Sequence, residues 1–132
     1  MALTAQEAFD LSKLFRDFAI ALGNYRFANW QSLTPTQRRD IEDEEWSLIN
    51  ASSNMTTKAV GLALEESETS VNSIKKSVRK AKRAIKKLKK VSQIINVAAA
   101  TVGLGAAIVS KDAGSIAKNA KLVLKAADVL PA

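Results

Sequence analysis

Residues 60–109 read VGLALEESETSVNSIKKSVRKAKRAIKKLKKVSQIINVAAATVGLGAAIV, and this stretch decides the fold. Apolar or small side chains recur in it at alternating steps of four and three residues. This spacing is a heptad repeat held over about seven heptads, which is typical of one face of a long helix. The positions of this heptad seam are Val60, Leu64, Ser67, Val71, Ile74, Val78, Ala81, Ile85, Leu88, Ser92, Ile95, Ala99, Val102, Ala106 and Val109. The sequence therefore predicts an all-α protein built on one long heptad-patterned helix.

The heptad seam also predicts a surface for helix–helix association, because an apolar stripe on a helix must be buried against another element. At ~1.5 Å per residue, a helix over residues 55–109 would be roughly 80 Å long, which exceeds what a compact domain needs. We therefore expect an elongated helical bundle or helical hairpin. The seam residues with the strongest expected contribution to association are Val71, Ile74, Val78, Ile85, Leu88, Ile95 and Val102.

Shorter helices are predicted on both sides of the long one, all within a single domain over residues 1–132. A helix over about 4–31 begins with Thr4 and Glu7, whose spacing is that of a capping box. A second helix over about 35–50 begins after Thr34, with proline in the favoured first position. A last helix over about 113–129 is expected to fold back on the long one as a helical hairpin.

Two local features of the second helix are open to test. The polar run NASSN at 50–54 predicts a break, because short polar side chains bond to nearby backbone groups. One uninterrupted helix is the alternative. Ile41, Leu48, Ile49 and Trp46 are expected to offer the buried face of this helix. Trp30 is expected to be a packing residue as well, and a lipid interface is the alternative for both tryptophans.

Charge is segregated along the chain, although 20 Lys and Arg against 13 Asp and Glu give a net charge of only +7. Ten basic residues and no acidic one lie between residues 75 and 90. This basic patch consists of Lys75, Lys76, Arg79, Lys80, Lys82, Arg83, Lys86, Lys87, Lys89 and Lys90. It has three interpretations: a solvated helix face, a surface for the acidic segment of another helix, or a site for an anionic membrane or nucleic acid.

Residues 91–109 contain no charged side chain. As a helix they would span ~28 Å, close to the ~30 Å hydrocarbon core of a bilayer. A buried helix of a soluble bundle is the first interpretation of this segment, and membrane insertion is the alternative. The residues that would form the membrane segment in the alternative are Ile94, Ile95, Val97, Val102, Gly103, Leu104, Ile108 and Val109.

The composition excludes several kinds of chemistry. The chain has no cysteine and no histidine, so disulfides, thiolate nucleophiles and the commonest general base and metal ligand are absent. It has no phosphate-binding loop, and the acidic run at 40–45 lacks the spacing of a calcium-binding loop. We therefore expect a non-enzymatic protein with no catalytic residues, no metal, no cofactor and no small-molecule substrate.

These patterns leave three functional hypotheses. The first is a protein that acts by helix–helix association, with itself or with another helical protein. The second is a membrane-active, pore-forming or permeabilising protein that uses residues 75–127 on an anionic membrane. The third, less favoured, is a basic helical protein associated with nucleic acid. The N-terminus lacks the pattern of a secretory signal, so a cytoplasmic location is expected, with membrane association as the alternative.

Overall fold

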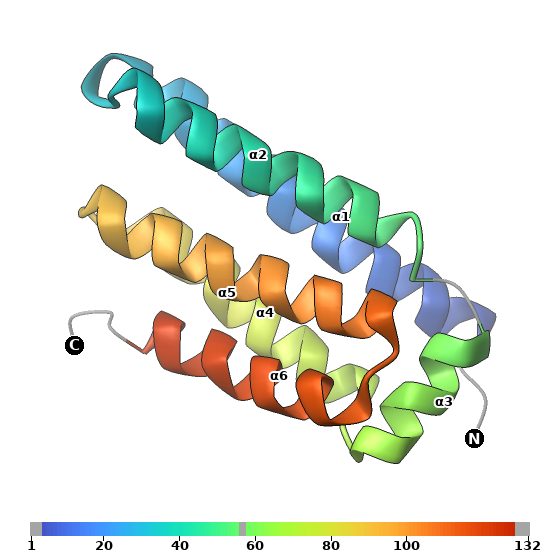
Figure 1. Ribbon diagram of the computed structural model, residues 1–132. Coiled ribbons are helices and arrows are strands. Elements are labelled where there is room, and N and C mark those ends of the chain that lie inside the picture. Colours follow the sequence, from blue (N-terminus) through green and yellow to red (C-terminus); the bar gives the residue numbers. More distant parts are fainter. Residues whose placement is uncertain (1–3, 56–57, 129–132) are drawn as a thin grey trace.

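The computed structural model describes residues 4–55 and 58–128, and in these residues it contains α-helices, one 3-10 turn and no strand (Figure 1). The prediction of an all-α protein is therefore confirmed. The elements in chain order are α1 (Ala5–Ala28), η1 (Trp30–Ser32), α2 (Pro35–Ser52), α3 (Lys58–Ser67), α4 (Val71–Lys87), α5 (Val91–Ser110) and α6 (Ala113–Ala127).

The predicted starts of the first two helices are confirmed by their hydrogen bonds. The Thr4 side chain accepts from the Glu7 backbone N–H at 3.0 Å, and the Glu7 carboxylate accepts from the Thr4 N–H at 3.1 Å. Thr34 and Gln37 make the same reciprocal pair at the start of α2. Each pair satisfies two backbone donors that an uncapped helix would leave free. The Thr34 cap fixes where α2 begins after the α1–α2 turn.

The predicted single helix over 55–109 is wrong, because the chain forms three helices there, α3, α4 and α5. The first break follows Ser67, and Glu68 adopts a left-handed backbone conformation with φ of 59°. The Ser70 side chain then caps α4 by accepting from the Ser73 N–H at 3.0 Å. Serine and threonine favour such caps over a helix interior, because their hydroxyls compete for backbone hydrogen bonds.

The second break lies between α4 and α5, where Leu88 and Lys90 have extended backbone conformations. Lysines crowd this point, and a helix end relieves the repulsion between like charges spaced three or four residues apart. A helix C-terminus also carries partial negative charge, so Lys86 and Lys87 in the last turn of α4 are favourably placed. The break lets α5 fold back antiparallel to α4 instead of extending it (Figure 1).

The break also changes which face of the chain is buried. On α4 the heptad seam is buried as predicted, at positions such as Ile74, Val78 and Ile85. On α5 the seam residues Ile95 and Val102 are only half-buried. The buried face of α5 is instead formed by Ile94, Val97, Ala98, Thr101, Leu104, Gly105, Ala107 and Ile108. A turn resets the helical phase, so a heptad register cannot continue through it.

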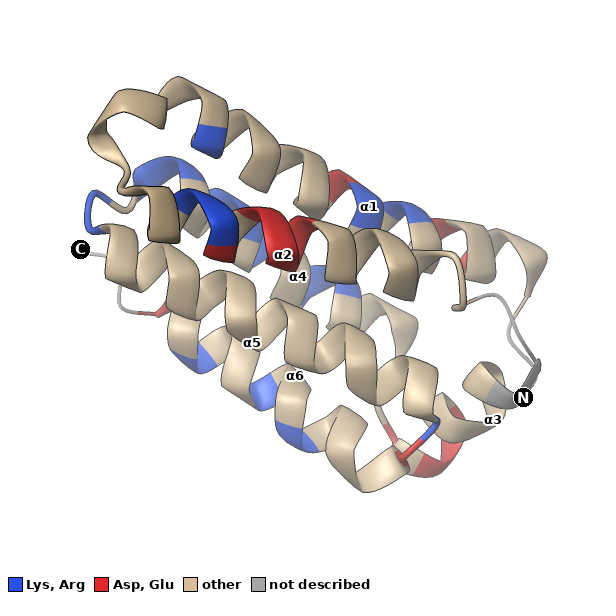
Figure 2. Cartoon of the chain, turned by 45° about the horizontal axis from the view of Figure 1, so that its top comes forward, with Lys and Arg blue, Asp and Glu red and all other residues tan. Residues whose placement is uncertain are grey.

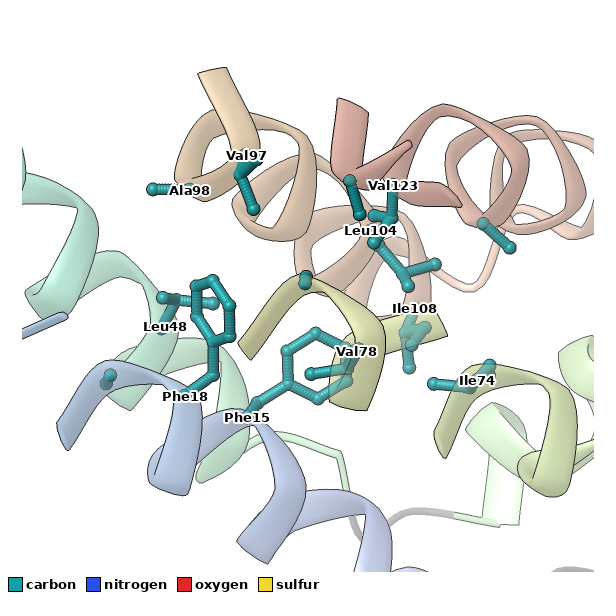
Figure 3. Close-up of a cluster of buried hydrophobic side chains, with 14 of the residues drawn as sticks. Phe15, Phe18, Leu48, Ile74, Val78, Val97, Ala98, Leu104, Ile108 and Val123 are labelled. Carbon is teal, nitrogen blue, oxygen red and sulfur yellow. The ribbon is translucent and has the colours of Figure 1, made fainter. Parts of the chain in front are cut away.

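The helices form a short bundle around one core rather than an elongated rod (Figure 1). Helix α5 contacts α2 on one side and α4 and α6 on the other, while the short α3 packs against α5 and α6 at one end. The core draws side chains from every long helix, as Figure 3 shows for Phe15, Leu48, Val78, Leu104 and Val123. The predicted α5–α6 hairpin is confirmed; Lys111 has a φ of 62° and Asp112 caps α6.

The second helix ends at Ser52, which confirms the predicted break within residues 50–54. The prediction of a buried face is wrong, however, for two residues of this helix. Ile41 and Leu48 are fully buried, whereas Ile49 and Trp46 are exposed, with 59% of Trp46 accessible to solvent. Trp30 is likewise exposed and is not a core residue. The apolar stripe of α2 is therefore narrower than its sequence suggests, because α2 lies at the outside of the bundle.

Candidate partner-binding surfaces

The heptad seam is used inside the chain itself. Its α4 members Ile74, Val78 and Ile85 are at most 3% exposed, because α4 packs against α1, α5 and α6. The α4 seam residues therefore offer no free stripe to a second molecule while the bundle is closed. The predicted association residues Val71 and Leu88 are buried as well.

The basic patch lies mainly on the outward face of α4 and on the α4–α5 connection, and Figure 2 contrasts it with the acidic residues of α2. Lys75 is half-buried and its Nζ lies 3.0 Å from the Asp10 carboxylate of α1, and Lys80 pairs with Asp128. In the described part of the chain, no acidic side chain lies within salt-bridge distance of the other eight residues of the patch. The folded chain therefore leaves most of this charge for water, counterions or an anionic partner.

Asp10 shows how the patch acts on its surroundings. Its carboxylate accepts hydrogen bonds from the Lys75 ammonium and from the Gln6 amide. These bonds, with the charges of Lys75 and Arg79, hold the pKa of Asp10 below its ordinary value. Asp10 thus stays ionised and ties α1 to α4 at one end of the patch.

A groove of about 760 Å³ runs between the second half of α1 and the end of α4. Its apolar lining comes from Ile20, Ala21 and Tyr25 of α1 and from Ile85 and Leu88. Basic and polar side chains also line it, namely Lys82, Lys86, Lys89, Asp17, Asn24 and Asn29. A second hollow of about 410 Å³ continues along the same two helices and shares Asp17 and Lys82 with the first. The groove combines an apolar surface with lysines, so it suits a partner that is both apolar and acidic.

Aromatic side chains cluster where α1 gives way to η1. Phe27 and Trp30 are 69% and 43% exposed, and their rings stack with centroids 6.2 Å apart. The Arg26 guanidinium lies 4.7 Å from the centre of the Phe27 ring, and that of Arg38 lies 4.4 Å from the centre of the Trp30 ring. These contacts hold two large apolar side chains in place at the surface of the bundle.

Arg26 itself was not expected to be buried. It is 8% exposed, and its Nε lies 2.7 Å from Glu45 and its Nη1 3.4 Å from Glu42. These carboxylates raise the pKa of Arg26, with the Glu45 hydrogen bond as the first cause. Gly23 makes room for the pair, since a side-chain carbon there would lie 2.9 Å from a Glu45 oxygen. This pairing was not predicted from the sequence, because it joins two helices through residues 19 positions apart.

Helix α5 is the one helix of the described residues that is long and apolar enough to cross a membrane, with a mean hydropathy of 1.6. Of the 18 residues that make up its most apolar stretch, 44% are buried inside the bundle. Of the residues predicted to form the possible membrane segment, Ile94, Val97, Leu104 and Ile108 are buried. The others, Ile95, Val102, Gly103 and Val109, are half-buried. In the closed bundle, these side chains are therefore largely packed in the protein core.

The acidic run of α2 contains one carboxylate in an unusual environment. A Glu44 oxygen is buried and has no hydrogen-bond partner in the described structure. Burial, and then the charges of Asp40 and Asp43, raise the pKa of Glu44 to about 7. Among the described residues, no three acidic side chains are grouped so that they could hold a metal ion.

Comparisons of the chain with protein-family models, with curated proteins and with solved structures found no match.

Proposed function

We propose that this chain is a non-catalytic, membrane-active protein that binds an anionic lipid surface and can release α5 into the bilayer. The observation that carries the proposal is that an exposed basic segment is followed directly in the sequence by an uncharged helix. The exposed lysines Lys86, Lys87, Lys89 and Lys90 are followed at once by the uncharged helix α5. Basic side chains near an anionic surface gain roughly 1 kcal/mol each, so they would bring α5 to the headgroups.

The length and composition of α5 support the second step. Its 20 residues correspond to ~30 Å of helix, which matches the hydrocarbon thickness of a bilayer. Lys90 precedes it and Lys111 follows it, so charged groups would flank the inserted segment on both sides. The closed bundle conceals this helix among α2, α4 and α6, as a water-soluble form requires.

The first experiment measures co-flotation and dye release with phosphatidylcholine vesicles that contain either 30% or no phosphatidylserine. We expect binding and release with the anionic vesicles, and both should weaken as salt rises. An absence of co-flotation with anionic vesicles between pH 5 and pH 8 would overturn the proposal.

A disulfide between α2 and α5 tests whether α5 must leave the bundle. The Ala51 Cβ lies 3.4 Å from where a side-chain carbon of Gly105 would be. That separation is just below the ~3.5–4.5 Å typical of disulfides, so a small adjustment would allow the bond. The chain has no cysteine of its own, so the double variant Ala51→Cys with Gly105→Cys has one possible intramolecular pairing.

The locked variant should bind anionic vesicles when oxidised but release dye only after reduction. The two single-cysteine variants are matched controls, because they carry the same substitutions and cannot form the intramolecular bond. Equal release by the oxidised and reduced double variant would show that α5 stays in the bundle, and the insertion step would then be abandoned.

A second candidate function, helix–helix association, is favoured by the groove between α1 and α4. Its apolar surface and its lysines Lys82, Lys86 and Lys89 suit an acidic amphipathic helix of another protein. The test is binding of a model acidic amphipathic helical peptide, followed by the variant Ile20→Glu, which places a charge on the apolar side of the groove. A peptide that binds the variant as well as the original chain would contradict this use of the groove.

A further inference from the structure

We infer that the protein meets the lipid surface with one end of the bundle, which carries Phe27, Trp30 and the lysines of the α4–α5 connection. This inference rests on the proposed function and adds which surface makes the contact. Figure 1 shows that the α1–α2 connection and the α4–α5 connection lie at the same end of the bundle. The groove confirms their proximity, since Ala28 and Asn29 line it together with Leu88 and Lys89. We call this surface the aromatic–basic end.

The aromatic pair has the character of an interfacial anchor. Large aromatic side chains at the surface of a soluble bundle expose apolar area to water, and the membrane–water interface is where tryptophan is enriched. The pair is also ordered before any contact. The Arg38 Nε donates to the Trp30 carbonyl at 2.8 Å, while its guanidinium lies over the indole ring. An ordered anchor loses little conformational entropy when it binds.

The charge at the same end is complementary to an anionic lipid surface. Lys86, Lys87, Lys89 and Lys90 are exposed, and the described structure pairs none of them with an acid. Arginine stays charged at all relevant pH values, and Arg38 adds a cation directly beside the indole. Apolar rings and cations at one end of the bundle can contact acyl chains and headgroups at the same time.

Nucleic acid fits this end less well than lipid does. A base would need a free aromatic face on which to stack. The Trp30 ring already stacks with Phe27 and carries the Arg38 guanidinium on its face. Phe27 and Trp30 nevertheless remain 69% and 43% exposed, and exposed apolar area is what an interfacial anchor buries. We therefore assign the surface to lipid and treat nucleic acid as an outcome of the test.

The two tryptophans of the chain provide matched probes. Trp46 is 59% exposed, similar to Trp30 at 43%, but it lies in the second half of α2. The spacing from Pro35, at the start of α2, to Trp46 corresponds to about 16 Å along the helix. The variant Trp46→Phe leaves Trp30 as the single fluorophore, and Trp30→Phe leaves Trp46. Both are measured with vesicles containing 30% phosphatidylserine and a brominated phosphatidylcholine as quencher.

We expect the fluorescence of Trp30 to shift to shorter wavelength and to be quenched by the brominated lipid, while Trp46 stays close to its value in buffer. The double variant Phe27→Ser with Trp30→Ser should weaken vesicle binding at least fivefold. The control double variant Phe9→Ser with Trp46→Ser removes two exposed aromatics elsewhere and should bind like the original chain. Circular dichroism of each variant checks that the helices remain.

The outcomes separate this inference from the proposed function. If the original chain floats with anionic vesicles and releases dye, but Trp46 is quenched as strongly as Trp30, the orientation inferred here is wrong and the function stands. If the original chain does not float, the proposed function fails. If the Phe27 and Trp30 double variant loses binding to duplex DNA and keeps its vesicle binding, the assignment of this end to lipid is overturned.

Discussion

Replacing Glu44 by glutamine should change how the stability of the protein depends on pH. Glu44 lies on α2, which packs against α1 and α5, and one of its carboxylate oxygens is buried without a hydrogen-bond partner in the described structure. Burial opposes ionisation most, and the neighbouring charges of Asp40 and Asp43 add to it. Together they raise the pKa of Glu44 from its ordinary 4.5 to about 7 in the folded state. Folding is therefore linked to proton binding at this carboxyl.

The sign of the effect follows from which state holds the proton. Between about pH 4.5 and pH 7, the folded chain keeps Glu44 protonated while the unfolded chain has lost that proton. The free energy of unfolding therefore falls as pH rises through this window and stays lowered above it. The difference in pKa corresponds to at most about 3 kcal/mol. Water at the partly exposed side chain reduces the expected loss to about 1–2 kcal/mol.

The assay is urea denaturation followed by circular dichroism at pH 5 and at pH 8. Glu44→Gln should match the original chain at pH 5 and exceed its free energy of unfolding by about 1–2 kcal/mol at pH 8. The control variant Glu66→Gln replaces an exposed carboxylate of α3 and should show no such difference. Parallel pH profiles for the original chain and Glu44→Gln would refute the reasoning, since they would show that Glu44 ionises without cost in the fold.

Four further outcomes are expected. Ile74→Ala should lower the free energy of unfolding by about 3 kcal/mol without changing the mass in sedimentation, because Ile74 is fully buried in the chain's own core. Gly105→Ala should raise the melting temperature, because alanine favours the helix over glycine by about 1 kcal/mol. The added carbon would lie in ordinary contact with its neighbours, at 3.4–3.5 Å. Gly23→Ala should lack that gain because its carbon would lie 2.9 Å from a Glu45 oxygen. In urea denaturation, Thr34→Ala should cost about 1 kcal/mol through loss of the α2 cap.

Part of the candidate site could be read from residue spacing and part could not. The basic patch was predicted residue by residue, and exposure of most of its members agrees with an outward face. The aromatic–basic end was not predicted, because Phe27 and Lys89 are far apart in the sequence and come to the same end of the bundle only through packing of α1 against α4. The buried pair of Arg26 and Glu45 was missed for the same reason.

The sequence by itself determined the class of the fold and the starts of α1 and α2. Thr4 and Thr34 act through hydrogen bonds within three residues, so their effect needs no tertiary contact. The Ser70 cap of α4 was missed, because the heptad spacing continues through it. The apolar stripe of α4 was equally evident, since it depends only on the period of the helix. What the period could not reveal is whether α4 continues into α5 or turns back.

Only the tertiary structure decided that question. A straight helix over 60–109 would leave its apolar stripe in water until a second molecule arrived, and association costs translational and rotational entropy. The turn between Lys87 and Val91 closes a very short loop, whose entropic cost is small. It brings α5 and α6 back onto α4, so one chain buries its own stripe. Heptad spacing is the same in both arrangements, and the packing of distant segments selects between them.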